Sequence, residues 1–178
     1  MERAQVERVA DLSDADRAAV RALGMAVFPP EEVADWPGRK IEWAAPEWCV
    51  RIFGDEGALV SYVGGYLRQA TSNERPVRVG GIGNVKTHPA ARKRGFAGMA
   101  IRRVVEFFAT QGVDFGLLVC APDLIDYYAC LGWHPFDGRL IVRQQGAVAD
   151  FTLYGAMTLA VGSEAPRDGT IDLCGPPW

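Results

Sequence analysis

Three consecutive basic residues, Arg92, Lys93 and Arg94, stand immediately before Gly95, where an amphipathic helix is expected to begin. The first turn of a helix offers unpaired N–H groups and the positive end of the helix dipole, and both favour an anion. Gly95 and Gly98 lack a β-carbon, so the backbone can approach a phosphate closely, and arginine can hold phosphate oxygens with two hydrogen bonds. These residues predict a loop that binds phosphate or pyrophosphate. A solvated turn is the alternative that they leave open.

Two common nucleotide-binding motifs do not fit this region. The pattern G-x-x-x-x-G-K-[ST] of a Walker loop is absent. Gly81 and Gly83 precede Asn84, and the third glycine of a dinucleotide fingerprint is missing. We therefore interpret these two glycines as residues that loosen or bulge a strand.

The composition restricts the function classes. The chain has 178 residues and a net charge of −3, which fits a single domain over 1–178 and argues against a general nucleic-acid-binding protein. No apolar run approaches the roughly 18 residues of a membrane span, and the N-terminal stretch has no secretory apolar segment. We expect a cytoplasmic protein without nucleic-acid or membrane partners, and residues 162–178 as a C-terminal tail. A homodimer remains open.

The four cysteines, Cys49, Cys120, Cys130 and Cys174, are widely spaced. They form no C-x-x-C pair, and no histidine lies nearby at zinc-ligand spacing. Free thiols in a reducing compartment are therefore expected, and no metal site.

The elements that must position the basic loop follow from hydrophobic periodicity and from breaker residues. Ser13 or Asp14 is a suitable N-cap for a first helix. Trp36, Trp43 and Trp48 lie in or beside an irregular segment, 31–47, and either pack in the core or line a ligand cleft. The order of elements predicts a mixed α/β fold, a sheet with helices on both faces. The functional site is expected at the strand-to-helix junction, residues 85–98. The expected helices are 15–28, 96–110 and 122–130, and the expected strands are 48–53, 58–68, 77–87, 115–120, 140–143 and 151–159.

Two ordered motifs resemble the GNAT acyltransferase superfamily over residues 50–160. Residues 85–98, V-K-T-H-P-A-A-R-K-R-G-F-A-G, resemble its strand followed by [Q/R]-x-x-G-x-[G/A], matched by Arg92, Gly95 and Ala97. Residues 121–133, A-P-D-L-I-D-Y-Y-A-C-L-G-W, resemble its second landmark, with Tyr128 in the tyrosine position. The resemblance implies a central, twisted, mostly antiparallel sheet with helices on both faces. It also implies an N-acetyltransferase that moves the acetyl group of acetyl-CoA to a primary amine of a small molecule.

The resemblance assigns roles to single residues. The backbone of Val85 and Thr87 would pair with the pantetheine amides, and the loop before the helix would hold the pyrophosphate. Tyr128 would act as general acid at the thioester sulfur, with Tyr127 in reserve. The full set expected at the cofactor is Val85, Lys86, Thr87, Arg92, Lys93, Arg94, Gly95, Phe96, Ala97 and Gly98.

Acetyl transfer to an amine needs a deprotonated amine and a proton for the departing thiolate. A phenol, with an unperturbed pKa of about 10, can donate that proton. No Ser-His-Asp or Cys-His pattern is evident, so direct attack by the amine is expected. Many relatives carry a glutamate base on the strand where this chain has Gly83 and Asn84. The base stays open between His88, His134, water and a terminal carboxylate.

A narrower resemblance concerns the acceptor. Residues 132–138, G-W-H-P-F-D-G, and 172–178, D-L-C-G-P-P-W, are similar to aminoglycoside 2′-N-acetyltransferases. This similarity implies an aminoglycoside or aminosugar acceptor held by acids and by the carboxylate of the last tryptophan. Asp35, Asn84, Asp150 and Trp178 are the expected acceptor residues. An acyl-CoA-binding module, or an O-acyltransferase or longer-chain acyltransferase of the same fold, is the alternative.

Overall fold

In the computed structural model, residues 4–55 and 57–178 are described, and they form one ten-stranded sheet with three α-helices. Strands follow each other across the sheet in the order β6-β9-β5-β4-β3-β10-β7-β8, and β1 and β2 extend it beside β3. All pairs of strands are antiparallel except β4–β5 and β10–β7. The helices are α1 (Asp14–Val27), α2 (Phe96–Thr110) and α3 (Ile125–Ala129), and the strands are β1 (Val6–Arg8), β2 (Trp48–Phe53), β3 (Leu59–Ser72), β4 (Arg75–Thr87), β5 (Phe115–Cys120), β6 (His134–Phe136), β7 (Arg139–Gln144), β8 (Ala147–Asp150), β9 (Gly155–Ala160) and β10 (Thr170–Asp172).

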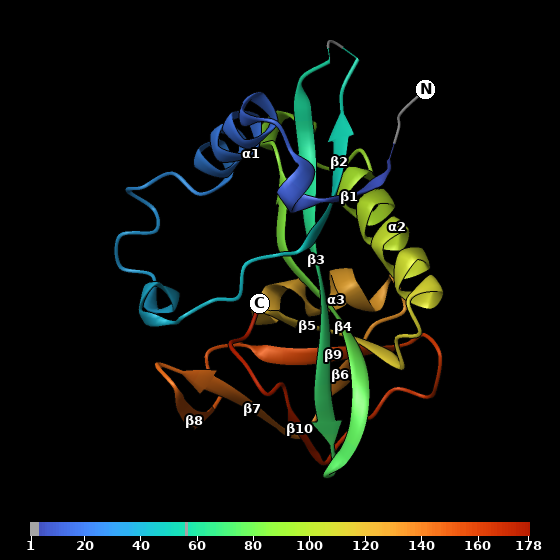
Figure 1. Ribbon diagram of the computed structural model, residues 1–178. Helices are drawn as coiled ribbons and strands as arrows, with labels where there is room; N and C mark the ends of the chain where they lie inside the picture. The colour runs from blue at the N-terminus through green and yellow to red at the C-terminus, as the bar shows by residue number, and fades with distance from the viewer. Residues whose placement is uncertain (1–3, 56) are drawn as a thin grey trace.

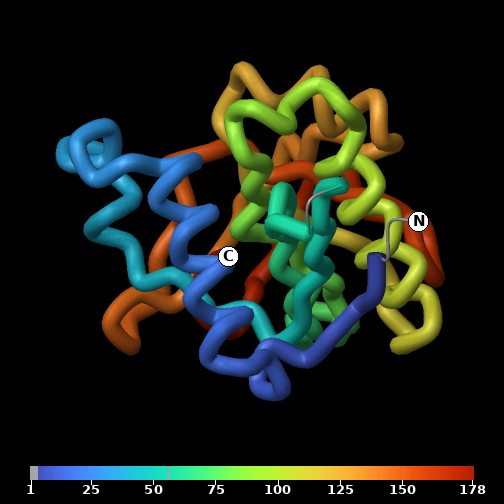
Figure 2. The backbone as a smooth tube through the Cα atoms, turned by 90° about the horizontal axis from the view of Figure 1, so that it is seen from above, coloured from blue at the N-terminus to red at the C-terminus, as the bar shows by residue number. Residues whose placement is uncertain are grey.

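Helices α1 and α2 lie on opposite sides of the strands β2, β3 and β4 (Figures 1 and 2). The start of α1 is fixed by Ser13, whose side chain accepts from Asp16 N–H while the Asp16 carboxylate accepts from Ser13 N–H. Leu23 of α1 packs in a cluster with Tyr62. On the other face, α2 buries Val104 and other residues of its apolar stripe in the largest core cluster. The expected mixed α+β sheet with helices on both faces is confirmed.

Several boundaries coincide with the sequence expectation and others do not. The helix at 96–110 and the strands at 48–53 and 115–120 are confirmed at both ends. The strand expected at 151–159 is wrong at its start, because Gln145 and Gly146 turn the chain with positive φ of 51° and 79°. The chain therefore returns early as β8, and β9 begins only at Gly155.

The expected C-terminal tail, residues 162–178, contributes one short strand to the sheet, β10 (Thr170–Asp172). Ile171 of β10 pairs with Ser72 on one side and with Leu140 on the other. Asp172 accepts two hydrogen bonds from the guanidinium of Arg143, at 2.9 and 3.0 Å. The segment could not be predicted as a strand because three residues between glycines and prolines carry little periodicity.

Candidate active site

Strands β4 and β5 run parallel and then separate. Their pairs are Val79–Phe115, Gly80–Gly116 and Gly81–Leu117. Beyond Gly81, β4 continues to Thr87 along β3, while β5 continues to Cys120 along β9. Among the described residues, no strand pairs with the edge of β4 that faces this opening beyond Gly81. Its N–H and C=O groups are therefore available to an extended ligand.

A bulge lies in β4 at the opening. The pairs Gly64–Gly83 and Tyr62–Lys86 leave one extra residue on β4. Asn84 lies in this bulge with a φ of 53°, a left-handed conformation that asparagine adopts more readily than most residues. Its side-chain amide donates to the hydroxyl of Tyr66 at 3.3 Å. The interpretation of this stretch as a bulged strand is thus confirmed, with the extra residue next to Gly83.

The basic loop joins the end of β4 to α2. Lys93 and Gly95 have φ of 63° and 84°, and Gly95 is the N-cap of α2 without a side-chain cap. A β-carbon on Gly95 would have no heavy atom within 4 Å, and Arg92, Lys93 and Arg94 are exposed. The first N–H groups of α2 and three cations therefore border free space, which fits an anion such as a pyrophosphate.

The protein contacts of this loop are weak. The Arg94 guanidinium lies 3.6 Å from the carboxylate of Asp55 and 4.9 Å from the ring centroid of Phe96. Both members of the ion pair are more than half exposed, so the pair holds the arginine only loosely. The cations of the loop thus keep most of their capacity for another anion.

Tyr128 lies on α3 and is 6% exposed. Burial raises the pKa of its phenol, and the neighbouring Cys120 and Tyr127 add to the increase. A phenol in such surroundings stays protonated at neutral pH and can donate a proton. Tyr127 packs edge-on against it at 5.2 Å and is 39% exposed, so the two neighbouring phenols differ clearly in burial.

The cysteine thiols are free, as expected. Cys120 ends β5 and is buried, with its Sγ 3.7 Å from the Sδ of Met157. Burial raises the pKa of Cys120 to about 11, so its thiolate is scarce at neutral pH. Cys120 is therefore poorly suited to form a covalent acyl intermediate.

The expected acceptor residues fall into two groups. Asn84 and Trp178 meet at Tyr66: its hydroxyl accepts from Asn84, and its ring stacks on the indole with centroids 5.3 Å apart. Asp150 lies on the edge strand β8, where it pairs with Arg139 at 2.8 Å. Asp35 is exposed in the segment between α1 and β2. No hydrogen bond or ion pair between described residues joins either carboxylate to Asn84 or Trp178.

The three tryptophans expected either to pack or to line a cleft have separate environments. Trp48 packs on Phe107 of α2, with centroids 4.7 Å apart. Trp36 and Trp43 stack at 5.9 Å, and the Trp36 indole donates to the hydroxyl of Tyr154 at 2.6 Å. Trp36 also lines a cavity of about 550 Å³ within residues 34–40. Trp48 is thus a packing residue, whereas Trp36 both packs and borders a cavity.

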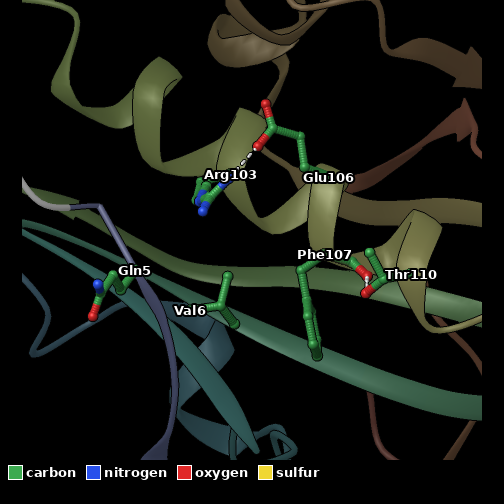
Figure 3. Close-up of a pocket in the computed structure, with 6 residues that line it drawn as sticks. All are labelled: Gln5, Val6, Arg103, Glu106, Phe107 and Thr110. Atoms are coloured by element: carbon green, nitrogen blue, oxygen red, sulfur yellow. Dashed lines mark hydrogen bonds and ion pairs between the residues drawn. The ribbon is translucent and has the colours of Figure 1, made fainter.

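A second cavity of about 320 Å³ lies between β1 and α2 (Figure 3). Its α2 residues, Arg103, Glu106, Phe107 and Thr110, come from the C-terminal half of the helix, away from Gly95. The ion pair of Arg103 with Glu106, at 2.7 Å, spans one helical turn on the surface. This cavity is therefore separate from the opening between β4 and β5.

Sequence reasoning missed the arrangement of Trp178 against β4 and β5. The indole N–H donates to the carbonyl oxygen of Leu117 at 3.1 Å. The signal was present in Gly81 and Gly83, since glycine inside a strand often marks the close approach of another group.

Within residues 4–55 and 57–178, no group of three or more His, Cys, Asp or Glu residues could hold a metal ion. Among the same residues, no helix has the length and apolar character needed to cross a membrane.

The separating parallel strands, the bulge and the glycine-capped helix can be compared with known proteins. The family model of the acetyltransferase (GNAT) domain matches residues 8–136. The chain belongs to the GNAT acetyltransferase family. None of the curated proteins matches it. The expected acyl-CoA-dependent acetyltransferase domain is thereby confirmed at the level of the family.

Solved structures of GNAT proteins share the fold at low sequence identity. An acyl-CoA N-acyltransferase from Pseudomonas aeruginosa has a TM-score of 0.63 and 18% identity, covering 90% of this chain and 100% of its own. YhbS, a GNAT family N-acetyltransferase from Escherichia coli in complex with CoA, has a TM-score of 0.62 and 15% identity, covering 98% and 91%. A GNAT family acetyltransferase from Brucella melitensis in complex with acetyl-CoA has a TM-score of 0.57 and 17% identity, covering 95% and 94%.

Proposed function

We propose that this GNAT domain is an N-acetyltransferase that moves the acetyl group of acetyl-CoA to a primary amine of a small molecule. The observation that carries the proposal is the continuity of the unpaired edge of β4 with the basic loop before α2. An extended chain that ends in a pyrophosphate, as coenzyme A does, matches both parts at once.

The residues of this chain would hold the donor in two ways. Backbone groups of Val85 and Thr87, on the unpaired edge, would pair with the pantetheine amides. The loop from Arg92 to Gly98 would bind the pyrophosphate through the first N–H groups of α2 and through its three cations. Lys86 would contact the donor mainly through its backbone groups. Its side-chain Nζ lies over the ring of Tyr62, 5.6 Å from the centroid, on the α1 side of the sheet.

Transfer would proceed by direct attack. The amine nitrogen forms a bond to the acetyl carbon, the bond from that carbon to sulfur breaks, and the thiolate takes a proton from the Tyr128 hydroxyl. The nitrogen loses one proton to the base, and the Tyr128 phenolate regains one from solvent. The products are an acetamide and free coenzyme A. The Tyr128 phenol is protonated at neutral pH, as an unperturbed tyrosine would also be. Burial raises its pKa and makes it a weaker acid, so proton donation depends on the hydroxyl lying against the departing sulfur.

The base for the amine proton is proposed to be water or the terminal carboxylate of Trp178, whose carbon would lie 3.0 Å from a β-carbon on Gly83. Gly83 offers no carboxylate at the position where many relatives have one. His88 Nδ1 already accepts a hydrogen bond from Ala90 N–H, at 3.3 Å, at the start of a short 3-10 helix. His134 is exposed on β6, which β9 separates from β5 in the sheet. An amine that enters in its neutral form needs no dedicated base.

An aminosugar or aminoglycoside is the acceptor class proposed first. Asn84, exposed at the bulge, offers an amide oxygen to a hydroxyl or amine of such a molecule. Asp35 is exposed and could receive a second ammonium group, whereas Asp150 would first have to leave Arg139. Trp178 borders the same place through Tyr66. The similarity of the last residues to aminoglycoside 2′-N-acetyltransferases supports the same acceptor class.

The test combines binding and turnover. Calorimetry with CoA is expected to give one site per chain, and thiol release from acetyl-CoA is expected with at least one member of a panel of aminoglycosides, aminosugars, polyamines and amino acids. No binding of CoA would refute the proposal. Binding of CoA without thiol release from any amine, or release with hydroxyl acceptors alone, would favour a binding module or an O-acyltransferase instead.

A further inference from the structure

The side chain of Trp178 lies at the narrow end of the opening between β4 and β5. Gly81 and Leu117 are the last residues that pair across the two strands, and the indole N–H is bonded to the carbonyl of Leu117. Trp178 is 5% exposed. Figure 1 shows the C-terminus near the centre of the molecule, beside β5. The indole thus contacts both strands where they begin to separate.

The indole occupies the space that side chains of β4 would otherwise fill. A β-carbon on Gly81 would lie 2.3 Å from indole Cε2, a distance that real atoms do not reach. A β-carbon on Gly83 would lie 3.0 Å from the main-chain carboxyl carbon of Trp178 and 3.2 Å from Cε2 of Tyr66. Gly81 therefore requires glycine for as long as Trp178 is in place, and a β-carbon on Gly83 would force its neighbours to shift slightly. The two glycines and the tryptophan form one packing unit.

The indole is held from several directions and has little freedom to move aside. Tyr66 stacks on it with an interplanar angle of 19°, and the Arg68 guanidinium lies 4.9 Å from its centroid. The Arg68 side chain also donates to the carbonyl of Pro176. The carbonyl of Pro177 accepts from Ala44 N–H at 2.7 Å. A ring fixed in this way forms a stiff wall rather than an adaptable one.

We propose that the indole of Trp178 limits the length of the acyl chain that the enzyme accepts, by filling the narrow end of the opening. This inference rests on the proposed function, in which the donor lies along the unpaired edge of β4. The pyrophosphate loop follows the far end of that edge at Thr87, so the thioester end points toward Gly81. The acyl chain then extends toward Trp178. An acetyl group has only one methyl beyond its carbonyl carbon, so it reaches less far toward the indole than a longer chain does.

Longer chains would have to displace a packed indole. An apolar pocket distinguishes ligands that differ by one methylene by roughly 10- to 200-fold. Replacement of Trp178 by alanine removes the wall and leaves an apolar cavity next to Gly81 and Gly83, since neither glycine has a side chain to fill it. A longer acyl chain can occupy that cavity, so selectivity against it should fall.

Calorimetry on the full chain without an acceptor tests the inference directly. The probes are CoA, acetyl-CoA, propionyl-CoA, butyryl-CoA and hexanoyl-CoA, and the variants are Trp178→Ala and Trp178→Phe. The wild type is expected to bind butyryl-CoA at least about tenfold more weakly than acetyl-CoA, and Trp178→Ala to reduce that ratio to below about threefold. Affinity for CoA itself, which has no acyl chain, is expected to change little. Trp178→Phe is expected to give an intermediate ratio, and it carries the comparison if the alanine variant does not fold.

Trp48→Ala is the matched control. It removes another indole, packed against Phe107 on the α2 face, and should leave the acyl preference unchanged. A wild type that binds all acyl-CoAs equally, or variants at Trp178 that keep the wild-type ratio, would overturn this inference and leave the proposed function intact. A wild type that does not bind CoA would overturn both.

Discussion

The side-chain amide of Asn84 donates a hydrogen bond to the hydroxyl of Tyr66, 3.3 Å away, from the extra residue of the β4 bulge. Tyr66 in turn stacks on Trp178, so one tyrosine connects the bulge to the narrow end of the opening. Because Asn84 has a φ of 53°, its conformation depends on residue type as well as on this bond. The bulge is therefore open to a direct test by substitution.

Asn84→Val is expected to destabilise the bulge, whereas Asn84→Gly is expected to preserve it. A left-handed residue costs about 1–2 kcal/mol for most side chains, and a β-branched side chain is strongly disfavoured there. Chemical denaturation should therefore show the valine variant about 1–2 kcal/mol less stable than the glycine variant. If both variants are equally stable, the bulge does not need this conformation.

Tyr128→Phe is expected to lower kcat by about 10²- to 10⁴-fold without changing the affinity for CoA, because the phenol is needed only when the thiolate leaves. The variant keeps the aromatic ring in the core cluster, so the fold is expected to persist. Thiol release and calorimetry on the same preparation separate the two effects. Tyr127→Phe is the control and should keep its activity. Equal kcat for wild type and Tyr128→Phe would show that Tyr128 is not the general acid.

Gly95→Ala is expected to weaken CoA binding by about tenfold, and Gly95→Glu to abolish it through bulk and like charge. Both glycines at the ends of α2, Gly95 and Gly112, have positive φ, and a β-carbon on either meets no atom within 4 Å. Gly112→Ala thus introduces the same backbone strain at the opposite end of the helix. Thermal unfolding should show similar losses for the two alanine variants, while calorimetry should show weaker binding only for Gly95→Ala. Equal CoA affinities for these two variants would show that the loop before α2 does not bind CoA.

The loop and its helix could be predicted because their signals are local. Glycine at a helix start, a run of cations and a 3.6-residue periodicity lie within about 25 residues, and α2 began and ended where expected. The strand at 115–120 was equally clear, since an uninterrupted apolar run of this length is typical of a buried strand. Tyr128 was assigned as general acid through its motif, and that role stays a prediction; the structure shows that the residue is buried on α3.

The other parts of the fold and of the candidate site depend on contacts between residues that are far apart in the sequence. Trp178 reaches Leu117 across 61 positions, and Trp36 reaches Tyr154 across 118. The separation of β4 from β5 has no signature in either strand, because it results from their different neighbours, β3 and β9. Gly81 and Gly83 were informative in hindsight: they indicated a close approach, but nothing in their own stretch identified the indole as the approaching group.

The last prediction concerns stability in acid. The carboxylate of Asp16 accepts hydrogen bonds from Ser13 and from Arg51, and these lower its pKa to about 2. A carboxylate whose pKa is lower in the folded state stabilises the fold above its unfolded pKa, near 3.8, and this stabilisation is lost as the pH falls toward about 2. Asp16→Asn should therefore lower the Tm at pH 7, and the difference from wild type should shrink between about pH 4 and pH 2. Asp14→Asn is the control. Asp14 is an exposed first-turn carboxylate without an ion pair to a described residue, so its replacement should lower the Tm less at pH 7. A Tm difference for Asp16→Asn that stays constant from pH 7 to pH 2 would show that the carboxylate contributes through packing rather than through its charge.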